Sequence, residues 1–198
     1  MFNWLLALDQ KAFLYLNGKH TPEWDFIMWW VSNNKIWIPL YLFLLLIIIY
    51  YERPYRFFFT ILFVIITVGL CDYISVLIKN LVERPRPTHS SEIADIVHIV
   101  NNYRGGKYGF VSSHAANFFG MATFLSNQFK HFRWSLFLFI WAVLVSYSRV
   151  YLGVHYPLDI ICGAVLGVLF GIQCYVLKVR TVVFIERFVE KSKKKKRK

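Results

Sequence analysis

Residues 36–51 read IWIPLYLFLLLIIIYY, a run without a single charged side chain, and residues 57–70, FFFTILFVIITVGL, repeat the pattern. A helix needs about 20 mostly apolar residues to cross the roughly 30 Å hydrocarbon core of a bilayer. Across all 198 residues, 57% are hydrophobic and only 17% are charged, whereas soluble domains carry about 25% charged residues. The sequence therefore predicts an all-α fold, a polytopic membrane helical bundle.

Five segments are apolar enough to be membrane spans. They cover residues 36–51, 54–81, 112–127, 134–150 and 157–179. Prolines at the start of the second and fifth segments favour a helix beginning there. We expect five transmembrane helices, or six if the N-terminal region also crosses the bilayer.

The N-terminal region is more polar than these spans. Residues 3–16 place apolar side chains at helical spacing but include charged ones, and residues 23–31 form a short segment rich in tryptophan. Such segments are typical of amphipathic helices that lie at the membrane surface. We predict three regions: N-terminal interfacial helices over 1–33, a transmembrane core over 34–180 and a basic tail over 181–198.

The net charge of +12 is distributed unevenly between the two ends of the spans. Arg53 and Arg56 follow the first span, Lys130 and Arg133 follow the third, and the tail 191–198 reads KSKKKKRK. Positive residues favour the cytoplasmic side, so these connections and the C-terminus are predicted to be cytoplasmic. The tail would attract anionic lipid headgroups. Without a folded basic surface beside it, the tail does not predict nucleic-acid binding.

Three polar clusters are then expected to meet at the opposite, outer face. They are KNLVERPRP at residues 79–87, VSSHAAN at 111–117 and SRVYLGVHYPLD at 148–159. Charged residues within membrane segments are costly and indicate function by default. Each cluster alone also has a structural explanation: a lysine extending to the headgroups, a serine N-cap, or a His–Asp pair closing a turn.

Together, the clusters have the composition of a phosphoryl-transfer site. Lys79, Arg86 and Arg149 supply three cations for a group whose transition state spreads negative charge over its oxygens. His114 and His155 are the residue type that serves as general acid and nucleophile. No acidic cluster is present to bind a metal ion, so neither a metal nor a cofactor is predicted.

Local spacing adds two details to this site. His155 and Asp159 flank the start of the fifth span, close enough for a carboxylate–imidazole hydrogen bond that fixes the tautomer of His155. Ser112 is a candidate N-cap of the third span, where free backbone N–H groups and the helix dipole favour an anion.

The motifs resemble those of the type 2 phosphatidic acid phosphatase superfamily. The pattern K-x6-RP is met from Lys79 to Pro87, PSGH is met in part at residues 111–114, and SR-x5-H-x3-D is met at residues 148–159. The resemblance covers about residues 71–179. This superfamily includes bacterial undecaprenyl-diphosphate, phosphatidylglycerophosphate and lipid A phosphatases, and its site is shared by soluble vanadium haloperoxidases.

The resemblance implies a role for each matching residue. His155 would attack phosphorus and form a phosphohistidine, Asp159 would orient His155, and His114 would protonate the leaving oxygen and then activate water. The phosphate would be held by Lys79, Arg86, Arg149, Ser112 and the backbone around Ser113. No metal would be needed. A two-histidine mechanism of this kind implies a bell-shaped dependence of rate on pH.

The middle motif departs from the family pattern at two positions. Val111 stands where the family has proline, and Ser113 stands where it has glycine. If that glycine served a positive φ, serine would be strained there; if it served only a close approach, serine would fit and add a hydroxyl. The two possibilities imply different geometries for the phosphate.

The predicted function is an integral-membrane lipid phosphate phosphatase acting at the outer face of a bacterial inner membrane. Undecaprenyl diphosphate is the leading substrate because the chain is short and has few additional loops, with lipid A and phosphatidylglycerophosphate as alternatives. A vanadate-dependent haloperoxidase and a non-catalytic lipid-binding or transport protein are the alternatives from other classes. The expected partners are the lipid substrate and the bilayer. No oligomeric state is predicted.

Overall fold

The computed structural model describes residues 3–195, and within them the fold consists of helices and loops without strands. This confirms the all-α prediction. The helices are α1 (Asn3–Asn17), α2 (Pro22–Ser32), α3 (Ile38–Tyr51), α4 (Pro54–Val82), α5 (Ser113–Phe129), α6 (Phe132–Tyr151) and α7 (Pro157–Lys195), with short 3-10 turns η1 (Asn34–Trp37) and η2 (Pro87–His89).

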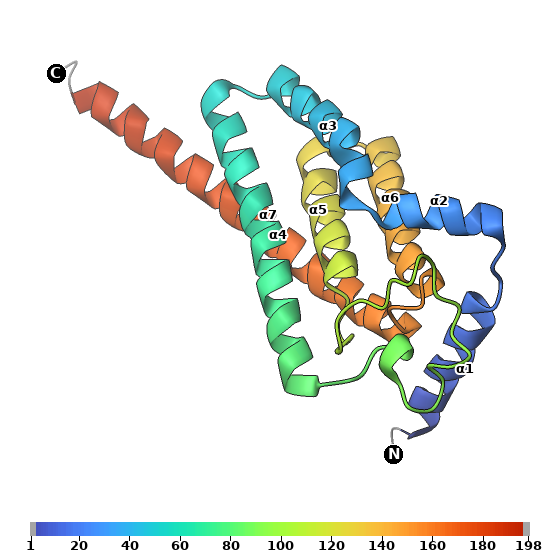
Figure 1. Ribbon diagram of the computed structural model, residues 1–198. Coiled ribbons are helices and arrows are strands. Elements are labelled where there is room, and N and C mark those ends of the chain that lie inside the picture. Colours follow the sequence, from blue (N-terminus) through green and yellow to red (C-terminus); the bar gives the residue numbers. More distant parts are fainter. Residues whose placement is uncertain (1–2, 196–198) are drawn as a thin grey trace.

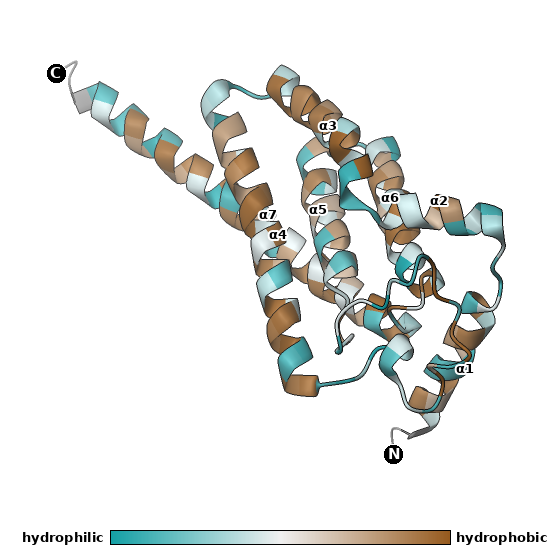
Figure 2. Cartoon of the chain, in the orientation of Figure 1, coloured by the Kyte–Doolittle hydropathy of each residue, from teal (hydrophilic) through white to brown (hydrophobic). Residues whose placement is uncertain are grey.

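Four helical segments are long and apolar enough to cross a membrane: Asn34–Tyr51, Pro54–Val82, Phe132–Tyr151 and Pro157–Lys194. Apolar residues cover the outer faces of α3 and α4 (Figure 2), where Leu42, Leu46 and Ile65 are exposed. Apolar side chains facing outward are stable in lipid rather than water. The protein is therefore an integral membrane protein, as predicted.

Helix α5, the predicted third span, lies at the centre and packs against α4, α6 and α7 (Figure 1). Its contact with α7 is close because both helices carry small residues. A Cβ added to Gly167 would lie 2.3 Å from the Ala116 carbonyl oxygen, and one added to Gly171 would lie 2.6 Å from that of Gly120. Small residues allow helix backbones to approach closely in membranes.

Helix α7 is longer than the sequence indicated. The fifth span was expected to end near Val179, but α7 continues to Lys195 and extends beyond the bundle (Figure 1). No glycine or proline interrupts residues 179–195, and the lysine, arginine and glutamate residues there are good helix formers. The remainder of the basic tail lies outside the described residues.

The N-terminal helices are short and pack against the end of the bundle that carries the long loop of residues 83–112 (Figure 1). Helix α1 has 15 residues and α2 has 11, so both are shorter than a span requires. Asn17 of α1 donates to the Tyr151 carbonyl at 2.8 Å and accepts from the His98 amide at 2.8 Å. These contacts fix α1 to both α6 and the loop.

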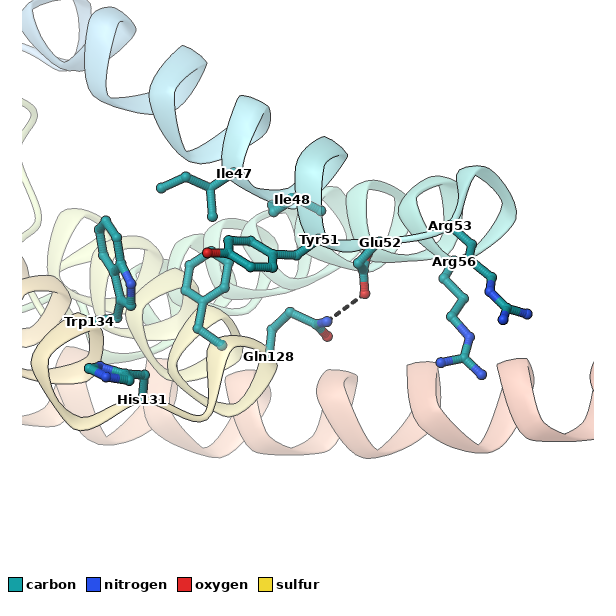
Figure 3. Close-up of a pocket in the computed structure, with 10 residues that line it drawn as sticks. Ile47, Ile48, Tyr51, Glu52, Arg53, Arg56, Gln128, His131 and Trp134 are labelled. Atoms are coloured by element: carbon teal, nitrogen blue, oxygen red, sulfur yellow. Dashed lines mark hydrogen bonds between the residues drawn. The ribbon is translucent and has the colours of Figure 1, made fainter.

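The opposite end of the bundle contains a pocket of about 500 Å³ beside a buried polar network (Figure 3). Lys178 donates to Glu52 at 3.1 Å and to Gln128 at 2.8 Å, and Thr60 donates to Glu52 at 2.6 Å. The Glu52 and Lys178 side chains are 10% and 7% exposed. Because these groups satisfy one another, the network connects α4, α5 and α7 and is structural.

Candidate active site

The long loop begins where α4 cannot continue. Glu83 caps α4 with φ 52°, and the prolines that follow exclude further helix. The chain then pairs with itself, because the Arg86 amide donates to the Lys107 carbonyl at 3.0 Å and the Gly109 amide donates to the Arg84 carbonyl at 2.9 Å. This pairing brings Arg86 over the end of the bundle.

His155 lies in the turn between α6 and α7 and is 1% exposed. Its Nδ1 lies 3.3 Å from Asp159 Oδ2, the contact predicted from their spacing, and its Nε2 lies 3.3 Å from Arg86 Nη1. With Nδ1–H donating to the carboxylate, Nε2 keeps its lone pair and faces the cation. Burial, and then the positive charges of Arg86 and Arg149, hold the pKa of His155 well below 6.5.

Asp159 is held more firmly than a simple His–Asp pair requires. Its Oδ2 also accepts the Tyr156 amide at 3.0 Å, and its backbone carbonyl accepts the Ser112 amide at 3.0 Å. Ser112 in turn caps α5, because its Oγ accepts the Ala115 amide at 3.3 Å. The first turns of α5 and α7 are thus fixed side by side.

The three predicted cations surround this turn. Arg86 donates to the Tyr108 carbonyl at 3.1 Å and the Val154 carbonyl at 3.2 Å. Arg149 donates to the hydroxyls of Ser32 and Tyr103, the latter at 3.1 Å. Both arginines are buried. Burial, followed by the charge of Arg149, lowers the pKa of Arg86.

Lys79, the third cation, donates to the hydroxyl of Ser113. Among residues 3–195, none of Lys79, Arg86 and Arg149 forms a salt bridge with a carboxylate. Buried charges are normally paired, so a cluster of unpaired cations is electrostatically prepared for an anionic ligand.

The backbone of Ser113 shows whether serine is strained at the position where the family has glycine. Its φ is not positive, because it is the first residue of α5, so serine is not strained there. Its hydroxyl instead lies 2.6 Å from that of Ser75 on α4, in addition to its bond from Lys79. The departure from the family glycine therefore adds a hydrogen bond that orients Lys79.

His114 lies in the first turn of α5, where its ring stacks on Phe118 with 6.4 Å between centroids. It lines an apolar groove of about 570 Å³ between α3, α4 and α5, whose walls include Tyr41, Leu42 and Val64. It also lines a smaller pocket of about 380 Å³ that reaches Arg149. His114 is thus the point at which two cavities meet.

Two charged residues of this site carried no role in the sequence analysis. Arg84 donates to Asp159 Oδ1 at 2.9 Å and to Asp9 Oδ2 at 2.7 Å, and its guanidinium lies 4.0 Å from the Tyr156 ring centroid. Asp9 also accepts the Leu158 amide at 2.9 Å. The available signal was Asp9 itself, a carboxylate in the amphipathic pattern of α1, whose side chain is buried and 4% exposed.

Comparison with known proteins establishes the family. The PAP2 superfamily model matches residues 57–182, which include every predicted site residue. The chain belongs to the PAP2 superfamily. It is 39% identical over 173 residues to a lipid A 4'-phosphatase of Bacteroides thetaiotaomicron, a match that covers 84% of this chain and 75% of the relative.

Two further PAP2 similarities are informative. An undecaprenyl-diphosphatase of Sulfolobus acidocaldarius is 48% identical over 60 residues, 30% of this chain and 29% of the relative. The crystal structure of Aquifex aeolicus LpxE superposes with a TM-score of 0.62 at 25% identity, covering 84% of this chain and 94% of that chain. We conclude that the protein is a membrane lipid phosphatase of the PAP2 superfamily.

Proposed function

We propose that this PAP2 phosphatase removes a phosphate from the sugar headgroup of lipid A. The observation that carries the proposal is a cluster of unpaired cations around a buried, neutral histidine, adjoining an apolar groove. The lipid A 4'-phosphatase relative matches over most of both chains, which favours lipid A over the undecaprenyl diphosphate that chain length had suggested.

The contacts of His155 support its role as nucleophile. Its Nε2 lone pair would form the N–P bond while the bond between phosphorus and the lipid oxygen breaks, and His114 would donate a proton to that oxygen. Water would then attack the phosphohistidine, give its proton to His114 and release phosphate. Asp159 would stabilise the positive charge that develops on the His155 ring.

The cations would stabilise the negative charge of the phosphoryl group in the transition state, which phosphoryl transfer also requires. Arg86, Arg149 and Lys79 would bind the three equatorial oxygens of the transferring group, assisted by Ser112 and the backbone N–H groups near Ser113. Because these donors are held by other contacts before substrate arrives, little reorganisation would accompany the reaction.

The apolar groove supports a lipid substrate. Leu42 lines it and is 55% exposed on the face of α3 that would contact lipid, so the groove opens toward the bilayer. An acyl chain could lie there while the phosphate reaches His114. The connections at the end of the bundle opposite the site are basic, which favours a cytoplasmic location for that end. The site would then lie at the outer face of the inner membrane.

The test is phosphate release by the purified protein in detergent with EDTA. The substrates are lipid A, undecaprenyl diphosphate, phosphatidylglycerophosphate and phosphatidic acid, each beside a His155→Ala control. We expect EDTA-resistant release that is fastest from lipid A and absent from the control. Fastest phosphate release from undecaprenyl diphosphate would favour that lipid as the substrate. The undecaprenyl-diphosphatase relative matches part of this chain. Release that persists in the control would contradict the histidine mechanism.

A further inference from the structure

The pocket of about 380 Å³ has a lining unlike that of the apolar groove. One wall is aromatic, because Trp29 of α2 and Tyr103 of the loop pack edge to face with centroids 5.8 Å apart. Another wall is polar and consists of Asn33, Asn34 and Lys35 at the start of η1. An aromatic face beside amide and ammonium groups suits a ligand that is flat and apolar on one face and polar at its edges.

The polar wall contains hydrogen-bond donors that have no partner among the described residues. Asn34 and Lys35 are exposed, and among residues 3–195 neither side chain makes a hydrogen bond or salt bridge. Asn33, in contrast, is occupied, because its Oδ1 accepts the Lys35 amide at 3.0 Å and so fixes the turn. Lys35 offers three N–H donors, and the Asn34 amide offers both donors and an acceptor. Hydroxyl groups are the natural partners of this combination.

Arg149 connects this pocket to the phosphate site. It lines the pocket and is 4% exposed, and its Nη2 donates to Tyr103 in the aromatic wall. Its buried Nε has no partner among the described residues, although buried donors are normally satisfied. A phosphate bound to Arg149 would therefore place its ester partner toward the aromatic and polar walls of this pocket.

We propose that this pocket is a sugar-binding subsite that selects lipids whose phosphate is attached directly to a sugar ring. The ring lies against Trp29 and Tyr103, and its hydroxyl groups accept hydrogen bonds from Lys35 and Asn34. The proposal deepens the proposed function and rests on it, because the subsite is useful only if the phosphate is cleaved from a sugar.

The first test compares kcat/KM for lipid A with kcat/KM for phosphatidic acid, whose phosphate is attached to glycerol. Lys35→Met removes the ammonium group and keeps the length of the side chain. We expect the ratio of the two kcat/KM values to fall about tenfold, since a tenfold change corresponds to about 1.4 kcal/mol, the scale of one hydrogen bond to a charged donor. Lys11→Met, an exposed lysine of α1, is the matched control and should leave the ratio unchanged.

A second test does not depend on lipid A turnover. Inhibition of phosphatidic acid hydrolysis by a glucosamine phosphate should be stronger than inhibition by a glycerol phosphate, and Lys35→Met and Trp29→Leu should each remove most of that difference. Equal inhibition of the wild-type protein by the two compounds, or a Lys35→Met change that slows both lipids equally, would overturn the subsite. If wild-type protein prefers the sugar phosphate but does not hydrolyse lipid A, the proposed substrate fails and the subsite stands.

Discussion

The neutrality of His155 is imposed by its surroundings. The ring is buried near the positive charges of Arg86, Arg149 and Lys79, and its Nδ1 contacts the Asp159 carboxylate. Both burial and the cations disfavour the imidazolium, so the pKa lies well below 6.5. The proposed nucleophile would therefore be available at neutral pH without a separate base.

The burial of His155 and its positive neighbours predict how kcat/KM changes at acidic pH. Because the neutral form of His155 persists as pH falls through 6.5, the acid limb of kcat/KM should lie below that value. Arg86→Gln removes a positive neighbour and should raise the pKa of His155, so its remaining activity should fall at a higher pH than that of the wild-type protein. Measuring kcat/KM against pH for both proteins tests this. An acid limb that moves to lower pH in the variant would contradict the assignment.

Trapping the phosphorylated intermediate should distinguish the roles of His114 and His155. His114→Ala should slow turnover about 100- to 10,000-fold, the usual contribution of general acid–base catalysis, while still forming some phosphohistidine. His155→Ala should form none. Labelled phosphate that is retained on base-quenched protein and lost after acid treatment identifies phosphohistidine, which is stable to base and labile to acid, and its amount distinguishes the variants. Equal labelling of both variants would exclude His155 as the nucleophile.

At the scale of elements, α1 contacts the candidate active site although it lies far from the motifs in sequence. Asp9 joins Arg84 to the first turn of α7 by accepting the Leu158 amide. Arg84 holds the Asp159 oxygen that His155 does not use. The helix therefore restrains the turn that carries His155, the proposed nucleophile.

Asp9→Asn tests this restraint. Loss of the charge weakens the contact with Arg84 and loosens Asp159, so we expect kcat to fall about tenfold with little change in KM, since small misplacements of reacting groups are costly. Asp95→Asn, an exposed loop carboxylate, should change neither constant. A rise in KM at constant kcat would indicate that α1 contributes to binding and not to positioning.

The sequence predicted four of its five spans, and the motif residues, because both are local patterns; the expected third span forms α5, which is not among the four segments long and apolar enough to cross a membrane. Residues 36–51 and 54–81 are long apolar runs, and the spacing of His155 and Asp159 corresponds to one helical turn. The contact between Asp9 and Arg84 joins residues 75 apart, and no periodicity reports such a contact. The true end of α7 was missed for another reason, since hydropathy falls near residue 179 while helix propensity does not.

For the whole molecule, the candidate active site and a buried ion pair lie at opposite ends of the bundle. The candidate site lies under the loop 83–112, while the buried pair of Glu52 and Lys178 joins the turn between α3 and α4 to α7 at the other end. This separation allows a destabilising change that leaves the reaction untouched.

Lys178→Met should show this separation. It leaves Glu52 buried without its charged partner, which typically costs about 3–5 kcal/mol, so the midpoint of thermal unfolding in detergent should fall clearly. Lys178→Met combined with Glu52→Gln should recover much of the loss. Below the unfolding transition, the KM for phosphatidic acid should match that of the wild-type protein. A single variant as stable as wild type would show that the pair contributes little.

The proposed opening of the apolar groove toward the bilayer at Leu42 has a consequence for kinetics. A substrate that enters from the bilayer arrives by two-dimensional diffusion, and the quantity that saturates the enzyme is its mole fraction among neighbouring lipids. Adding inert detergent at a constant amount of substrate should then slow the reaction, although the concentration in the tube is unchanged. The dephosphorylated lipid returns to the membrane and the phosphate departs into water, so the two products leave the site in different phases.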